Sequence, residues 1–209
     1  MYANAEKKAY VTISLVTLNI VAYLYLIYFN YRYLGDWQID NTSLGIMATG
    51  GLVKNSVLVD YQWYRVITSM FLQFNLVHLI TNMITLYYLG IMVEKYLGHF
   101  KYLFLYFGSG LVANLFSLYF QNVDAVSAGA SGAIFGIFAF FILGKWYLPN
   151  QPELAQLGKT YAILILLNLA LNITDTSVNM IAHVMGFLSG LAIMGIYIFF
   201  AKNKRFQKY

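Results

Sequence analysis

The chain has 209 residues, of which 60% are hydrophobic and only 10% are charged, and its mean hydropathy is +0.64. An ordinary soluble domain is roughly one quarter charged, so this composition excludes a water-soluble fold and indicates an integral membrane protein. The absence of cysteine excludes disulfides, thiolate metal sites and cysteine nucleophiles, and the formal net charge of +5 has to be judged by where the charges fall along the chain.

Six long apolar runs follow one another along the chain, each bounded by charged residues, glycine or proline. A bilayer core about 30 Å thick needs roughly 20 apolar residues to be crossed by a helix, so each run predicts a transmembrane helix. No repeat or soluble segment interrupts them, and we expect residues 1–209 to form one all-α bundle in which the fifth helix is the shortest. The expected helices are residues 10–29, 76–93, 102–120, 131–147, 160–173 and 178–201.

The first run follows Lys7 and Lys8, as a signal peptide would, but it is too long for the apolar region of a signal peptide and no small-residue cleavage site follows it. We interpret it as a retained helix. Residues 30–75 form the one long connection. Because a structureless loop of that length is uncommon, we expect it to fold at the membrane surface, where Trp37 and Trp63 suit the interface.

Lysine and arginine residues are divided unequally between the two ends of the six runs. Ten of the thirteen lie on the side of the N-terminus, and only Arg32, Lys54 and Arg65 lie on the opposite side. Since cytoplasmic loops carry an excess of these residues, both termini are expected to be cytoplasmic.

Four polar residues in the second, fourth and sixth runs stand out, because a polar side chain in a membrane is costly unless it is paired. A rise of 1.5 Å per residue places His78, Ser131 and His183 about 22 to 27 Å from the inner ends of their helices. All three then share one layer several ångströms below the outer surface, and Asn82 lies one turn deeper on the face of His78. Three other asparagines are interpreted as ordinary interhelical hydrogen-bonding groups: Asn19, Asn114 and Asn168.

Glycine pairs spaced four residues apart accompany two of these polar residues. Gly132 and Gly136 follow the serine of the fourth run, and Gly186 and Gly190 follow the histidine of the sixth. Such steps let helix backbones approach closely, although generic membrane packing also produces them. Their position just after the serine and the histidine favours a functional site over generic packing.

A serine hydroxyl becomes a strong nucleophile when a base takes its proton, and a neutral imidazole is the usual base near neutral pH. We therefore interpret Ser131 as a nucleophile and His183 as its base. The Ser131 amide at a helix start, with His78 and Asn82, can donate hydrogen bonds to an oxyanion. No Asp or Glu lies inside the six runs, so we predict a Ser–His dyad whose imidazole packs on Phe135.

At these residues the chain resembles the rhomboid family of intramembrane proteases, in the basic six-helix form and over nearly its whole length. The family's GASG motif stands at residues 129–132, its HxxxN motif at residues 78–82, and its AHxxGxxxG motif at residues 182–190. The long connection also carries the family's tryptophan and arginine, Trp63 and Arg65, but here a tyrosine separates them.

The resemblance implies hydrolysis of single-span membrane substrates near their outer ends, without a metal or cofactor, by a multi-pass protein of a bacterial plasma membrane. Its surroundings are the lipid bilayer, and no nucleic-acid partner is expected. It implies Ser131 as nucleophile, His183 as base, and His78, Asn82 and the Ser131 amide as oxyanion donors. The residues expected to support this site by packing are Gly129, Gly132, Phe135, Gly136, Gly186 and Gly190.

Two alternatives stay open. The family includes catalytically silent members that bind membrane proteins, and these generally lack the serine or the histidine, whereas both are present here. A small transporter that uses the polar layer as a path is the other alternative, but the runs contain no acid and no proline. For a protease, the substrate helix is expected to reach the serine past the fifth helix.

Overall fold

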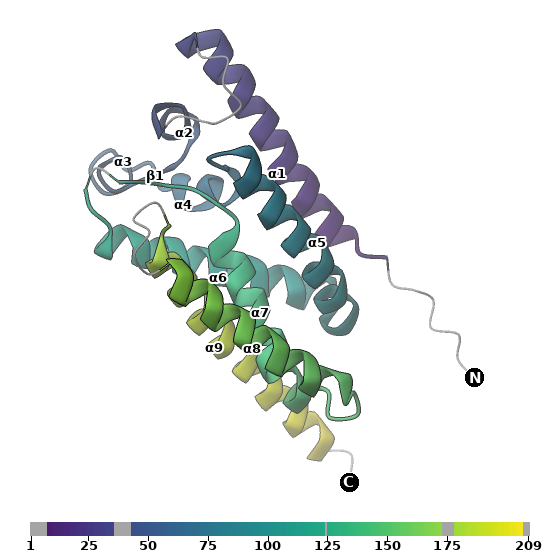
Figure 1. Cartoon of the computed structure of the whole chain (residues 1–209). Coiled ribbons are helices and arrows are strands. Elements are labelled where there is room, and N and C mark those ends of the chain that lie inside the picture. The colour runs from purple at the N-terminus through teal and green to yellow at the C-terminus, as the bar shows by residue number, and fades with distance from the viewer. Residues whose placement is uncertain (1–7, 36–42, 124, 173–177, 207–209) are drawn as a thin grey trace.

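The computed structural model describes residues 8–35, 43–123, 125–172 and 178–206. Six long helices form an all-α membrane bundle (Figure 1), which confirms the predicted fold class. The direction of the bundle across the membrane stays a prediction. The six helices are α1 (Tyr10–Phe29), α5 (Leu76–Leu97), α6 (His99–Phe120), α7 (Ser131–Tyr147), α8 (Glu153–Asn172) and α9 (Met180–Phe206).

Several helices extend beyond the apolar runs that predict them. Helix α5 continues through Glu94 and ends before Gly98, whose φ of +80° suits glycine. Helix α6 follows at once from His99 rather than from residue 102, and α9 spans Met180–Phe206 rather than residues 178–201. Helix α8 begins seven residues before the predicted run, so it is 20 residues long and α7, with 17, is shorter. The predicted end of α8 at Ile173 lies outside the described residues.

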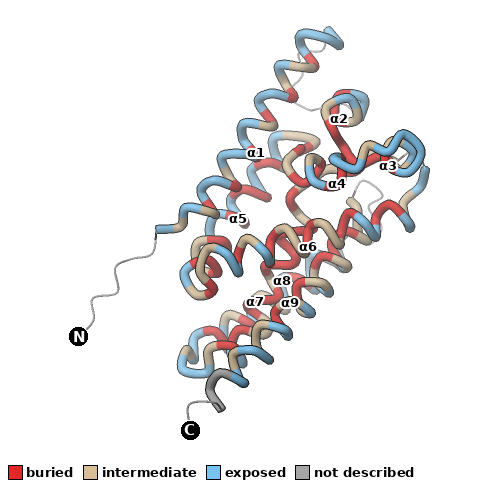
Figure 2. Tube along the Cα trace, turned by 180° about the vertical axis from the view of Figure 1, so that it is seen from behind, coloured by how far each residue is buried: buried red, intermediate tan, exposed pale blue. Residues whose placement is uncertain are grey.

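Exposed residues run along the outer sides of the helices (Figure 2), and many of them are large and apolar. Within the described residues, four helical stretches are long and apolar enough to cross a membrane: residues 10–34, 76–97, 99–120 and 180–203. Helix α7 is apolar but shorter. Large side chains such as Leu24, Ile84 and Phe200 point outward, which is favourable in lipid and unfavourable in water.

The connection between α1 and α5 is folded, as expected, and Figure 1 shows its short elements gathered at one end of the bundle. Its strand β1 pairs antiparallel with β2 (Val126–Ser127), which precedes α7, so the connection is joined to the segment that leads into Ser131. Trp63 is 49% exposed, whereas Trp37 lies outside the described residues. The elements are η1 (Asn30–Leu34), α2 (Ser43–Thr49), β1 (Leu52–Val53), α3 (Lys54–Leu58), α4 (Arg65–Thr68) and η2 (Ser69–Phe71).

Arg65 holds this connection together. Its side chain is only 7% exposed, and Nη1 donates hydrogen bonds to the carbonyl oxygens of Met47 at 2.6 Å and Gly51 at 2.8 Å. Its Nε donates to Oε1 of Gln62 at 2.6 Å. The planar guanidinium with its five donors can satisfy three acceptors at once, which a lysine ammonium cannot do in this geometry.

We expect Arg65→Ala to lower the free energy of unfolding by about 2 to 3 kcal/mol, because it leaves buried carbonyl groups without their charged donor. Unfolding in mixed micelles, followed by circular dichroism, measures the change. Arg32→Ala is the matched control, since Arg32 is exposed and its guanidinium lies 5.6 Å from the centre of the Tyr33 ring. A loss below about 0.5 kcal/mol for Arg65→Ala would show that the connection does not depend on this side chain.

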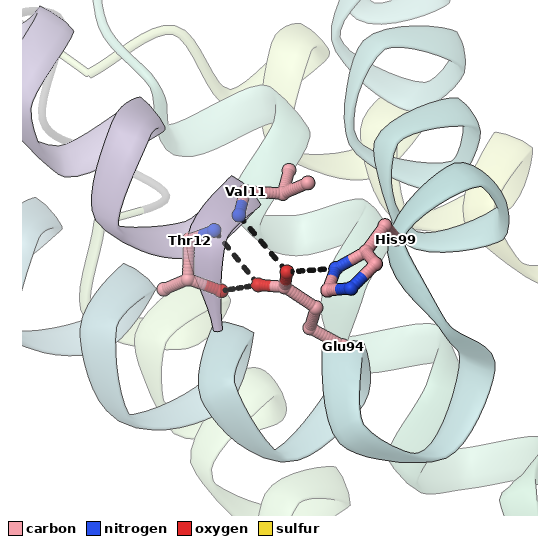
Figure 3. A network of polar contacts seen from close by, with 4 residues as sticks. All are labelled: Val11, Thr12, Glu94 and His99. Carbon is pink, nitrogen blue, oxygen red and sulfur yellow. Dashed lines mark hydrogen bonds and ion pairs between the residues drawn. The ribbon is translucent and has the colours of Figure 1, made fainter. Parts of the chain in front are cut away.

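Glu94 is a charged residue that α5 carries beyond the end of its apolar run, and its carboxylate is fully paired. Its carboxylate is 1% exposed and accepts hydrogen bonds from the backbone N–H groups of Val11 at 2.9 Å and Thr12 at 2.8 Å, and from the Thr12 hydroxyl at 2.7 Å (Figure 3). His99 Nδ1 lies against the same carboxylate (Figure 3). The first N–H groups of a helix have no acceptor within it, so Glu94 caps α1 from a neighbouring helix.

Candidate active site

Ser131 and His183 meet at the starts of two parallel helices. Ser131 is the first residue of α7 and His183 lies in the first turn of α9, 52 positions later. The Ser131 Oγ and His183 Nε2 atoms are 3.0 Å apart, a hydrogen-bond distance. A base can therefore take the serine proton without a conformational change.

The imidazole of His183 is held by packing. Its ring stacks on that of Phe135, with 4.3 Å between ring centres and 14° between ring planes. Its Nδ1 atom is buried and has no hydrogen-bond partner among the described residues, while the whole side chain is 8% exposed. Within the described part of the chain, the pair is thus a dyad in geometry, without a carboxylate behind the histidine.

The four predicted glycines bring α7 and α9 into backbone contact. A Cβ atom on Gly186 would collide with the carbonyl oxygen of Gly132, and one on Gly190 would collide with that of Gly136. Gly136 also faces Ser109 of α6, where no Cβ would fit. Gly132 directly follows Ser131 and Gly186 lies three residues after His183, so these contacts fix how closely the hydroxyl and the imidazole approach.

Gly129 supplies a different kind of support. Its φ is +139°, a conformation that side chains rarely allow, and its N–H donates to the Ser69 carbonyl at 2.9 Å. A Cβ atom built there would lie 3.2 Å from Nε2 of His78 and 3.6 Å from Oγ of Ser131. The missing side chain therefore leaves open the space between the serine hydroxyl and the second histidine.

His78 is positioned at the start of α5. The Asn75 side chain caps this helix by accepting the His78 backbone N–H at 2.7 Å, and the His78 ring stacks on Phe74 with 6.2 Å between ring centres. Its Nδ1 lies 3.5 Å from the Phe74 backbone nitrogen. With Nδ1 turned to the backbone, Nε2 is the nitrogen that faces the space beside Ser131 and can carry a donor hydrogen.

Asn82 lies one turn along α5 and is tied into a chain of amides. Its Nδ2 donates to Oε1 of Gln73 at 2.8 Å, and Gln73 Nε2 donates to Oδ1 of Asn19 at 2.9 Å. Asn19 Nδ2 in turn donates to the Leu15 carbonyl at 2.9 Å. An amide NH₂ group has two hydrogens, so one can hold this chain while the other is available to a ligand. Asn19, interpreted from sequence as an interhelical group, does bridge elements in this way.

Asn179 was not singled out in the sequence, although an asparagine just before an apolar run is a recognised helix-start signal. Its Oδ1 accepts a hydrogen bond from the backbone N–H of Ala182 at 3.0 Å and so caps the start of α9. Ala182 directly precedes His183. Its Nδ2 donates to Ser127 at 2.8 Å and to Ser117 at 3.0 Å. One side chain therefore joins the start of α9 to α6 and to the segment leading into Ser131.

These residues line one open cavity of about 1490 Å³. Ser131, His183, His78 and Asn82 all contribute to its wall, which brings together the four polar residues predicted to share a layer. Faces of α5 and α8 also line it. The residues they contribute include Thr81 and Thr85 from α5, and Leu164, Ile165 and Asn168 from α8. Asn114 lines it too, and its Nδ2 donates to the Val66 carbonyl at 2.8 Å and to Ser69 Oγ at 2.9 Å.

Comparison with known proteins adds to this geometry. A profile of the Rhomboid domain matches residues 60–200. Rhomboid protease AarA of Providencia stuartii is 31% identical to the chain, in a match that covers 90% of this chain and 72% of that protein. RHOMBOID-like protein 2 of Arabidopsis thaliana is 32% identical, in a match that covers 69% of this chain and 45% of that protein. Rhomboid protease GluP of Bacillus subtilis is 27% identical, in a match that covers 72% of this chain and 29% of that protein. The chain thus spans less than half the length of the last two relatives.

Proposed function

The chain belongs to the rhomboid family, and from this premise we propose that it is an intramembrane serine endopeptidase that cleaves single-span membrane proteins. The observation that carries the proposal is the 3.0 Å contact between Ser131 Oγ and His183 Nε2 at the wall of the large cavity. Ser131 is the nucleophile and His183 its base. The multi-pass protein works in a plasma membrane.

The reaction begins when His183 Nε2 takes the Ser131 proton as Oγ attacks the carbonyl carbon of the substrate peptide bond. The resulting tetrahedral intermediate collapses when the imidazolium gives that proton to the leaving amine nitrogen, which breaks the C–N bond. Water then enters, His183 takes one of its protons, and hydroxide attack on the acyl-enzyme ester releases the new carboxyl end. The serine regains its proton, so the enzyme is unchanged.

The oxyanion of the tetrahedral intermediate lies in the space that Gly129 leaves open. The Ser131 backbone N–H, at the first residue of α7, is one of the amides without an acceptor in its own helix. The His78 imidazole and the Asn82 amide, one turn apart on α5, line the same cavity and supply the other donors. Each such donor typically lowers the barrier by about 3 to 4 kcal/mol, which corresponds to a factor of about 10² to 10³ in rate.

The substrate reaches Ser131 from the side of the bundle between α5 and α8. The cavity is lined by Thr81 and Thr85 of α5 and by Leu164 and Ile165 of α8, so a substrate segment meets hydroxyl groups on one side and apolar side chains on the other. A helical substrate hides its carbonyl groups in its own hydrogen bonds, and it therefore has to unwind locally before cleavage.

A fluorophosphonate probe tests the proposal, because it forms a stable covalent bond only with an activated serine. We expect the probe to label the wild-type protein in liposomes at a single site, and peptide mapping to identify that site as Ser131. Ser131→Ala should remove the label, whereas Ser109→Ala, which changes a buried serine of α6, should keep it. Absence of labelling in a folded wild-type protein would favour a catalytically silent membrane-protein binder.

A further inference from the structure

A second cavity lies between α7 and α8, at the end of the bundle away from Ser131. Its volume is about 240 Å³, and it is lined by Lys145 and Trp146 of α7 and by Lys159 of α8, among others. Lys145 follows Ser131 by 14 residues, so it lies about 21 Å along the helix from the candidate active site. The two cavities are therefore separate.

Small residues of α8 create this cavity. A Cβ atom on Gly158 would lie 2.5 Å from the carbonyl oxygen of Phe141, so glycine is needed for α8 to approach α7 here. Ala155 and Ala162 lie three residues before and four residues after it, on the same face, and both line the cavity. Short side chains on this face leave a groove, and Ile142 and Leu154 make its wall apolar.

Two positive charges stand at this groove without a compensating carboxylate. Within the described residues the only ion pair joins Glu94 to His99, so neither lysine is paired there. Glu153, at the start of α8, instead accepts a hydrogen bond from the Tyr96 hydroxyl at 3.0 Å. The Lys145 ammonium lies 4.0 Å from the centre of the Trp146 ring, a cation–π contact that leaves its hydrogens available to an anion.

We propose that this groove binds one anionic phospholipid from the surrounding leaflet. Its phosphate lies between Lys145 and Lys159, and an acyl chain follows the apolar wall. The occupant is a lipid because lysine beside an exposed tryptophan at the end of a membrane helix is typical of the bilayer interface. Basic pockets between membrane helices suit anionic head groups, and the apolar lining suits a hydrocarbon chain.

Native mass spectrometry of the full chain, with phosphatidylglycerol and phosphatidylcholine offered in equal amounts, tests this proposal. We expect the wild type to retain one phosphatidylglycerol molecule in preference to phosphatidylcholine. Each lysine near a membrane surface contributes a factor of about five in affinity, so the double variant K145Q/K159Q should bind phosphatidylglycerol about 30-fold more weakly. The matched control K95Q/K202Q removes two exposed lysines that do not line the groove and should bind within about twofold of wild type.

A variant that fills the groove distinguishes binding in the groove from general attraction of lipids to surface charge. Ala162→Phe keeps both lysines and should lose the retained lipid, with circular dichroism used to check that the bundle stays helical. Retention of the lipid by K145Q/K159Q, or by a folded Ala162→Phe protein, would overturn the proposal. Displacement of the lipid by inorganic phosphate alone would also overturn it, because the groove would then bind phosphate and not a lipid. A wild-type dimer without lipid that K145Q/K159Q converts to a monomer would overturn it as well, because the lysines would then contact a second copy of the chain.

Discussion

The His183→Ala variant is expected to cleave a transmembrane substrate at least about 10³-fold more slowly than the wild type while keeping its fold. The reason is that no other described base lies at hydrogen-bond distance from the Ser131 hydroxyl. Cleavage of a fluorescent single-span substrate in proteoliposomes measures the rate, and circular dichroism measures the fold. Because the serine and the histidine act as one unit, the double variant with Ser131→Ala should be about as slow as either single variant.

Phe135→Leu is the companion variant for this prediction. It keeps an apolar side chain against the His183 ring but removes the stacked contact of 4.3 Å, so the imidazole loses orientation and not its chemistry. We expect a much smaller fall in rate than for His183→Ala, of about fivefold, which corresponds to the roughly 1 kcal/mol of an aromatic pair. Near-normal cleavage by His183→Ala would show that another group serves as the base.

The Gly186→Val variant is expected to lose about 3 kcal/mol of stability or to fail to fold. A side chain at this position collides with the backbone carbonyl of Gly132, and a backbone atom cannot move aside as a flexible side chain can. Helices α7 and α9 would have to separate, which also moves His183 away from Ser131. Unfolding in mixed micelles measures the loss of stability, and probe labelling measures the loss of the site.

Gly195→Val is the matched control, because it places the same residue in the same helix where no heavy atom lies within 4 Å. We expect its stability to stay within about 1 kcal/mol of wild type, since it creates no overpacking. If Gly186→Val were as stable as Gly195→Val, close packing of α7 on α9 would not be what holds the two residues together.

The parts of the fold that follow from local pattern could be predicted. Helices α1 and α7 begin and end where their apolar runs do, because a hydrocarbon core tolerates few polar residues and the runs are bounded by polar or small ones. The shared depth of Ser131 and His183 followed from counting residues along straight helices of fixed rise. Their glycine steps indicate which faces can meet, and the backbones of α7 and α9 are in contact at those glycines.

The parts that depend on distant partners could not be predicted. Glu94 directly follows the predicted run of residues 76–93, because a charged residue is costly in a membrane; its acceptor role for α1 depends on residues 82 and 83 positions away. The partners of Gln73 and Asn179 are similarly remote, 54 positions for Asn19 and 52 for Ser127. Nothing in the local sequence identifies such partners. The start of α8 is not predicted for a simpler reason. Its first two turns contain polar residues and precede the apolar run.

The cap on α1 has a consequence for biosynthesis. The ribosome makes Thr12 first and adds Glu94 82 residues later, so the opening turn of α1 enters the bilayer before its carboxylate exists. Until α5 arrives, those amide hydrogens have to be solvated by water or by lipid head groups. This cap on α1 can therefore form only after residue 94 has been synthesised and α5 lies beside α1, although α1 is the first long helix to be made.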